Sequence, residues 1–447
     1  MPVTVSFVSL GCDKNTVDSE IMLERLLENG YELVKDDALA EVIIINTCGF
    51  IQSAQEESIE TILEMAAYKE SGCCKKLVVT GCLAQRFAKE IGEDLPEVDA
   101  VVGTGSYEEI VEVLDELLDS DQKIVRLGAL PDRDLGYQKR LLSTTGYYEY
   151  IKIAEGCDNF CTYCTIPSIR GRYRSRKAED IIREVRDLAE QGVTELMVVA
   201  QDITKYGKDL DEDIDLSDLL YMMCRVEGIH WIRLLYCYPE DITEKLIRTM
   251  ASEEKILPYI DMPIQHCSDS VLKRMNRKHS KAILQQVMDQ LRDAMPEVCI
   301  RTTLITGFPG ETEAEFEEMC DFVNEAGFDR LGVFTYSQEE GTPAARMKDQ
   351  VPEEEKERRK DVLMQIQQQV SREISESLIG SEMEVIVEGE IPDAVEEGHV
   401  YSARSYRDAP DIDGFVFVTT EEPHQSGDYI RCRISGAYEY DLIGEEI

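Results

Sequence analysis

The sequence predicts an α/β protein in three parts: an N-terminal doubly wound parallel α/β unit, a central partial (βα)6 barrel and a small C-terminal antiparallel β-barrel. Over most of the 447 residues, short apolar runs alternate with stretches of helical periodicity, a pattern typical of parallel sheets. From about residue 383 the pattern changes to short alternating strands with turn sequences at residues 413–414 and 426–427, which indicates a small barrel. The expected boundaries are residues 1–120, a linker at 121–146, residues 147–374 and residues 375–447.

Three strands are expected in the N-terminal part, and a cysteine follows each of them. The apolar runs at residues 3–10, 42–45 and 77–79 lead to Cys12, Cys48 and Cys82. In open α/β sheets the carboxyl ends of the strands converge on one crevice, which is where ligands bind. We therefore expect these cysteines to be neighbours in space, although each one alone would be interpreted as a small buried apolar residue.

Helices are expected between the strands of both α/β units. In the N-terminal unit a helix should cover residues 18–29, and a longer one should bury Ile59, Ile62, Leu63 and Ala66, which share one helical stripe. In the central unit the six expected strands are residues 148–154, 196–200, 231–236, 259–262, 299–305 and 331–336. Helical stretches such as 178–191 and 283–295 separate them, which predicts a partial barrel with catalytic residues at the carboxyl ends of its strands.

The loop after the first central strand carries three closely spaced cysteines, Cys157, Cys161 and Cys164. One tight loop with this spacing can direct three thiolates to a single centre. Soft sulfur ligands suit an iron–sulfur cluster, and the usual all-cysteine cluster takes four of them, so one iron would lack a protein ligand. A structural zinc or unmetallated core cysteines are the alternatives, but no histidine or fourth cysteine lies nearby in the sequence to complete a zinc site.

Composition adds a pronounced acidic character. The formal net charge is −43, and residues 375–447 hold 18 acidic and four basic residues with no lysine. Such a surface repels phosphate backbones and attracts basic macromolecules. Fourteen cysteines in motif-like contexts favour metal chemistry in a reducing compartment. The N-terminus is expected to be a strand and not a signal peptide, and no apolar run approaches membrane-spanning length. We expect a cytoplasmic protein.

These motifs resemble those of a known family along essentially the whole chain. The loop at 157–164 is similar to the cluster loop of radical S-adenosylmethionine (SAM) enzymes. Together with the N-terminal cysteines and the terminal barrel, it resembles the methylthiotransferases, whose barrel is the TRAM domain. The branch that modifies a ribosomal protein is the most similar, through residues 9–15 (SLGCDKN), 46–51 (NTCGFI), 157–161 (CDNFC), 170–176 (RGRYRSR) and 262–269 (MPIQHCSD). The chain departs from that branch at Asp13, where proline is usual, and at Cys267, where alanine is common.

The resemblance implies a cofactor set, a reaction and a substrate. Two 4Fe-4S clusters would be held by the two cysteine sets, and SAM would bind the open iron of the Cys157/Cys161/Cys164 cluster and give a 5′-deoxyadenosyl radical on reductive cleavage. A methylthio group would be added to an aspartate β-carbon of the twelfth small-subunit ribosomal protein, with separate sulfur and electron donors. The residues implied to contact SAM are Tyr163, Gln201, Asp202, Gly307 and Gly310.

Several motifs carry a simpler alternative. Without the family, residues 303–312 would be interpreted as a turn that opens a helix, and His266 as a structural histidine. The basic run at residues 170–177 is compatible with a nucleic-acid patch, a solvated loop or a role in orienting SAM or a carboxylate. A tRNA adenosine methylthiotransferase and a non-catalytic iron–sulfur carrier are the alternative functions. The acidic tail favours a basic protein substrate, with no stable binding to nucleic acid or membrane.

Overall fold

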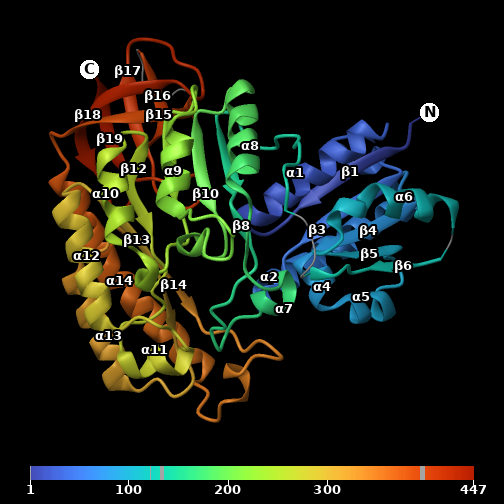
Figure 1. The fold of residues 1–447 in the computed structure, drawn as a ribbon, viewed down its shortest axis with the longest axis horizontal. Coiled ribbons are helices and arrows are strands. Elements are labelled where there is room, and N and C mark those ends of the chain that lie inside the picture. Colours follow the sequence, from blue (N-terminus) through green and yellow to red (C-terminus); the bar gives the residue numbers. More distant parts are fainter. Residues whose placement is uncertain (1, 121, 131–134, 393–397) are drawn as a thin grey trace.

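The computed structural model describes residues 2–120, 122–130, 135–392 and 398–447, and it divides into three units (Figure 1). The N-terminal unit, blue to teal in the figure, lies at one end of the molecule, and the red C-terminal barrel lies at the other. The core unit, green to orange, lies beside the N-terminal unit and carries the barrel on its upper end in this view. None of the described helices is long and apolar enough to cross a membrane.

The N-terminal unit is a six-stranded parallel sheet with the strand order β2-β1-β3-β4-β5-β6. Its strands are β1 (Thr4–Ser9), β2 (Glu32–Leu33), β3 (Val42–Thr47), β4 (Lys76–Gly81), β5 (Ala100–Gly103) and β6 (Ile124–Arg126). All six residues of β3 are buried, because a central parallel strand is covered by helices on both faces. Helices α1 (Asp13–Glu28) and α6 (Ile110–Asp119) cover one face; α2 (Gln52–Ala66), α4 (Cys82–Arg86) and α5 (Ala88–Asp94) cover the other. A short α3 (Tyr68–Ser71) follows α2. The predicted doubly wound unit is confirmed.

The face that α2 buries differs from the prediction. Ile62 and Ala66 are buried, but Ile59 and Leu63 are 40% and 49% exposed. The buried face is instead completed by Ser58, whose hydroxyl accepts a hydrogen bond from the Cys48 backbone N–H at 3.1 Å and donates one to the Cys48 carbonyl at 3.0 Å. A polar anchor to the main chain thus sets the rotation of the helix, and an apolar stripe in the sequence cannot reveal such an anchor.

The core unit is an open six-stranded parallel sheet with the order β14-β13-β12-β11-β10-β7. Its strands are β7 (Tyr148–Lys152), β10 (Glu195–Val199), β11 (Trp231–Leu234), β12 (Ile256–Asp261), β13 (Cys299–Thr306) and β14 (Arg330–Thr335). The helices are α7 (Ile166–Arg170), α8 (Ala178–Glu190), α9 (Leu216–Cys224), α10 (Glu244–Ser252), α11 (Asp269–Met275), α12 (Lys281–Ala294), α13 (Glu313–Ala326) and α14 (Glu353–Ser377). The expected partial barrel is confirmed, with all six strands within a few residues of their predicted positions.

The C-terminal unit is a closed barrel with the order β15-β16-β17-β19-β18. Its strands are β15 (Glu382–Glu390), β16 (His399–Ser405), β17 (Val416–Thr420), β18 (Tyr429–Ala437) and β19 (Leu442–Glu446). The predicted barrel is confirmed, and it includes one parallel pairing, between β17 and β19, beside four antiparallel ones. The barrel packs against aromatic residues of the core sheet, including Trp231 and Tyr259.

Candidate active site

The cluster loop is held at its base by a small two-stranded antiparallel ladder, β8 (Ala154–Glu155) with β9 (Arg174–Ser175). Gly156 adopts φ +77°, and a Cβ at this position would lie 2.1 Å from the Arg172 carbonyl oxygen. Glycine is therefore required where the loop leaves the ladder. Inside the loop, the Asn159 side chain donates to Asp202 at 2.9 Å, which ties the loop to the carboxyl end of β10.

The three cysteines of this loop share one buried environment. Cys157 and Cys161 are buried, and burial raises the pKa of Cys157 to about 11, with Asp202 and Cys161 adding to the effect. Burial also raises the pKa of Cys164, and Cys161 and Cys157 contribute to that shift. Backbone N–H groups point at two sulfurs, from Asn159 to Cys157 Sγ at 3.5 Å and from Ile166 to Cys164 Sγ at 3.4 Å. Such donors favour negative charge on sulfur, as a metal-bound thiolate requires.

The structure also brings the three N-terminal cysteines together. Cys12, Cys48 and Cys82 follow β1, β3 and β4, which are neighbours in the sheet. Burial raises the pKa of Cys82 to about 11, and Cys12 and Cys48 are close enough to add to the shift. A Cβ on Gly11 would lie 3.1 Å from Cys48 Cβ, so this edge of the sheet is closely packed. Cys12 itself is exposed, and the set therefore lies at the surface of the N-terminal unit.

Both sets offer donors that suit an iron–sulfur cluster. Each provides three sulfur atoms of the soft kind that such clusters bind. Among the described residues, no three His, Cys, Asp or Glu side chains are arranged to hold one metal ion. A cluster places each cysteine on a different iron, so its ligands need not meet at a single point.

The residues implied to contact SAM lie on two sides of the cluster loop. Tyr163 packs edge-on against Phe308, with ring centroids 6.4 Å apart, so the segment that begins at Gly307 lies beside the loop. On the other side, Gln201 Nε2 donates to Glu155 Oε1 at 3.0 Å. Asp202 is fully buried and accepts a hydrogen bond from the Thr204 backbone as well as from Asn159.

The two glycines take part in a local turn. Gly307 and Gly310 have φ of +72° and +76°. The Glu311 carboxylate accepts a hydrogen bond from the Gly307 N–H at 3.1 Å and lies 3.6 Å from Nε2 of the fully buried His266. The simpler interpretation of His266 as a structural residue therefore agrees with its surroundings.

The basic run is used mostly inside the protein. Arg170 and Arg176 are 2% and 6% exposed, and Arg176 pairs with Glu184 at 2.6 Å. Arg172 is exposed, pairs with Asp158 and lies over the Phe160 ring. With two of its arginines buried in ion pairs, this run does not form a continuous nucleic-acid patch.

Comparison with known proteins adds the family. Three family models match the chain: Uncharacterized protein family UPF0004 over residues 4–103, the Radical SAM superfamily over 151–323 and the TRAM domain over 379–447. The ribosomal protein uS12 methylthiotransferase RimO of Lachnoclostridium phytofermentans is 49% identical over 443 residues, which cover 98% of this chain and 99% of that protein. The enzyme of the same name from Acetivibrio thermocellus is 49% identical over 454 residues, covering 100% and 99%. This chain belongs to the uS12 methylthiotransferase family.

Solved structures agree with this uS12 methylthiotransferase at the level of the fold. The radical SAM methyltransferase TsrM from Kitasatospora setae has a TM-score of 0.58 at 13% identity, over 88% of this chain and 79% of its own. The cobalamin-dependent radical SAM enzyme OxsB has a TM-score of 0.53 at 11% identity, over 81% and 56%. The resemblance drawn from the motifs is confirmed, and the curated relatives carry the name of the ribosomal branch and not of a tRNA-modifying one.

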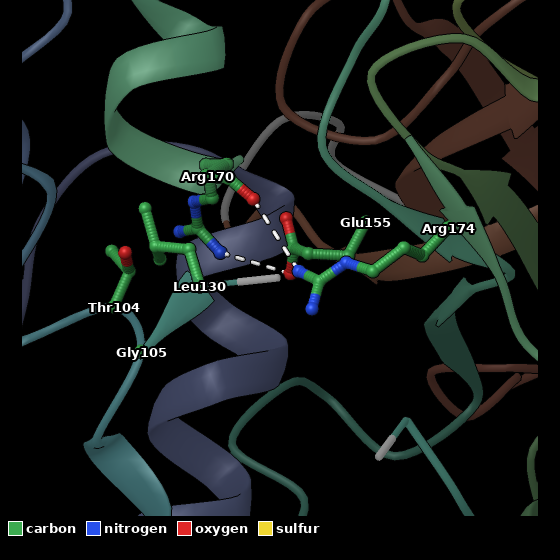
Figure 2. Close-up of a pocket in the computed structure, with 6 residues that line it drawn as sticks. All are labelled: Thr104, Gly105, Leu130, Glu155, Arg170 and Arg174. Carbon is green, nitrogen blue, oxygen red and sulfur yellow. Dashed lines mark hydrogen bonds and ion pairs between the residues drawn. The ribbon is translucent and has the colours of Figure 1, made fainter. Parts of the chain in front are cut away.

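One part of the site in this uS12 methylthiotransferase was missed by the sequence analysis. Lys152, Glu155 and Asp18 form a buried ion network with Arg170 between the two cysteine sets. Figure 2 shows the Arg170 guanidinium directed toward Glu155, with Thr104 of the N-terminal unit on its other side. A usable signal was present, because Glu149, Lys152 and Glu155 are the only charged residues in the strand region at 147–155, which is otherwise apolar or aromatic.

Proposed function

We propose that this radical SAM methylthiotransferase adds a methylthio group to the β-carbon of an aspartate in ribosomal protein uS12, with two 4Fe-4S clusters and SAM. The observation that carries the proposal is the pair of three-cysteine sets, one at the carboxyl edge of each parallel sheet, in a chain half identical to full-length uS12 methylthiotransferases. We keep the boundaries 1–120, 121–146, 147–374 and 375–447 as proposed, and the three matched family regions fall inside them. Strand β6 nevertheless pairs with the N-terminal sheet from within the linker, and α14 of the core ends at Ser377.

The roles of the residues follow from their surroundings. The first cluster would be held by Cys157, Cys161 and Cys164. When SAM is bound, this cluster supplies the electron for the cleavage of SAM. Cys12, Cys48 and Cys82 would hold the second. Three thiolates leave one iron of each cluster without a protein ligand, which keeps a position open for an exogenous group.

The flanking residues orient the cofactor site. Tyr163 provides a half-buried aromatic wall beside Phe308. Gln201 and Asp202, at the end of β10, are fixed by Glu155 and Asn159 respectively. Gly307 and Gly310 differ in the space beside them. A Cβ on Gly307 would lie 2.2 Å from Lys356 Cγ, whereas the nearest atom to a Cβ on Gly310 would be Arg274 Nε at 3.7 Å, so a ligand can approach the main chain closely only at Gly310.

The substrate proposal rests on charge. Of the four arginines after residue 375, Arg404 and Arg407 are buried and point into the core, where they pair with Glu195 and Asp329. The other two, Arg431 and Arg433, both contact Glu382. The outward face of the barrel therefore keeps few unpaired positive charges and a large excess of acidic residues, which favours a basic protein and disfavours nucleic acid. A ribosomal protein substrate would place the reaction in the cytoplasm, with separate sulfur and electron donors as further partners.

Iron counts test the two clusters. The wild type should bind about eight irons, and Cys157→Ala/Cys161→Ala/Cys164→Ala and Cys12→Ala/Cys48→Ala/Cys82→Ala should each keep about four. The first triple variant should lose SAM cleavage. The second should keep SAM cleavage but lose product.

Mass spectrometry of a uS12 peptide tests the substrate, and the expected result is a methylthio increment on aspartate. Product on a tRNA anticodon stem with none on the peptide would support the tRNA alternative. Clusters without any reductive SAM cleavage would support the carrier alternative.

A further inference from the structure

Four buried charged side chains lie between the two cysteine sets, and each comes from a different element. Asp18 belongs to α1 of the N-terminal unit, Lys152 ends β7, Glu155 ends β8 and Arg170 ends α7. Their side chains are only 2–5% exposed. Lys152 Nζ lies 2.9 Å from Glu155 Oε2 and also bonds to Asp18 Oδ1. Two positive and two negative charges thus compensate one another inside the protein, as buried charges must.

Arg170 has contacts that the other three lack. Its Nη1 donates to Asp18 Oδ2 at 2.6 Å and to Glu155 Oε2 at 3.2 Å. Its Nη2 donates to the Asn15 side chain and lies 3.5 Å from Cys82 Sγ. One guanidinium therefore reaches from the base of the core cluster loop to a sulfur of the N-terminal set.

Short covalent and hydrogen-bonded paths connect Arg170 to both sites. Helix α7 begins two residues after Cys164 and ends at Arg170, so it joins this residue rigidly to the cluster loop. On the N-terminal side, the Thr104 hydroxyl donates to the Ile169 carbonyl at 2.5 Å. Glu155 in turn accepts from Gln201, so the same network reaches the end of β10.

We propose that Arg170 is a positioning residue that fixes the Cys12/Cys48/Cys82 site against the core cluster loop and, through its contact with Cys82 Sγ, sets the potential of the cluster bound there. This inference rests on the second cluster of the proposed function. A planar guanidinium can hold a carboxylate on one nitrogen and a sulfur on the other, which a lysine ammonium cannot do in a fixed geometry. A positive hydrogen-bond donor at a ligating sulfur stabilises the reduced, more negative cluster and raises its potential.

The chain offers a matched control in Arg140. Its side chain is 2% exposed, and it bridges the same two units through Glu20 of α1 at 2.9 Å and Glu184 of α8 at 3.0 Å. It also donates to the Tyr150 carbonyl at 3.0 Å. Arg140→Gln removes the same charge and a comparable buried bridge, but its contacts are carboxylates and main chain instead of a cysteine sulfur.

The experiment uses the full chain with Cys157→Ala/Cys161→Ala/Cys164→Ala, which isolates the N-terminal cluster. Arg170→Gln, Arg170→Lys and Arg140→Gln are compared by iron content and by redox titration followed by electron paramagnetic resonance. Arg170→Gln should lower the reduced-to-oxidised ratio at fixed potential about tenfold, which is about 59 mV for a one-electron couple. Arg170→Lys should fall between this value and the parent, and Arg140→Gln should match the parent.

Equal potentials in Arg170→Gln and Arg140→Gln, with iron retained in both, would overturn the inference alone. A parent without iron would overturn the proposed second cluster and the inference with it. If Arg170→Gln does not fold, Arg170→Lys decides the question: it keeps the charge, so a potential equal to the parent's would remove any role for the guanidinium geometry.

Discussion

Glu195 is one of the buried carboxylates that hold the C-terminal barrel on the core, beside Asp329. It is fully buried and accepts from Arg233 of β11 at 3.0 Å and from Arg404 of β16 at 2.7 Å. Although burial opposes ionisation, Arg404 and Arg233 hold the pKa of Glu195 below its usual value, so the side chain is charged at neutral pH. Glu195→Gln would leave the fully buried Arg233 without its carboxylate partner, whereas Arg404 would keep Glu388.

Breaking a buried ion pair by removing one partner typically costs about 3–5 kcal/mol, because the other charge is left uncompensated. We expect Glu195→Gln to weaken the docking of the barrel by this amount. For an undocking transition with a urea dependence of about 2 kcal/mol per molar, the midpoint should fall by roughly 1.5–2.5 M.

The single tryptophan provides the assay. Trp231 is 4% exposed and packs edge-on against Tyr429 of the barrel, with ring centroids 5.0 Å apart. Its emission should shift to the red when the barrel leaves the core. The control is Glu384→Gln, which removes a contact with His230 across the same interface where both side chains are more than 40% exposed. The control should move the midpoint by less than about 0.5 M, since exposed pairs contribute at most about 1 kcal/mol. Equal shifts in the two variants would refute the argument.

Three further outcomes are expected. Burial, with Glu20 nearby, raises the pKa of Glu149 to about 7. The protonated carboxyl therefore stabilises the fold fully below about pH 4.5, and this stabilisation is lost as the pH rises through 7. The melting temperature should fall between pH 5.5 and 8, and it should fall less in Glu149→Gln. Gly156→Ala should abolish iron binding by the core loop because of the collision with Arg172, which leaves only the iron of the N-terminal set. Gly192→Ala, which has φ +101° and open space around it, should cost only about 1–2 kcal/mol of stability. An iron content in Gly156→Ala equal to that of the wild type would contradict this. Raising the salt concentration from 50 to 500 mM should lower kcat/KM for uS12 and leave substrate-free SAM cleavage unchanged. Only the encounter with uS12 depends on attraction between opposite charges. A salt-independent kcat/KM would remove the electrostatic argument for the acidic barrel.

Periodicity predicts all six strands of the core sheet but only three of the six N-terminal strands, because β2, β5 and β6 are short, with two to four residues each. The six core strands and the closed barrel lie close to their expected positions, because parallel strands buried on both faces are continuous apolar runs bounded by turns. The rotation of α2 was not predictable in this way. It depends on a hydrogen bond between Ser58 and the Cys48 main chain, and a serine at a buried position leaves no trace in an apolar pattern.

The sequence by itself determined the family, the fold class and the two three-cysteine sets, since these depend on local spacing and on the rule that strand ends converge. Tertiary structure alone decided how the sets are connected. The partners of Arg170 are Asp18, Glu155 and Cys82, which lie 152, 15 and 88 residues away in the chain. A run of arginines in a sequence carries no information about such distant partners. Only the folded chain determines which of those arginines loses its water and must therefore find buried counter-charges.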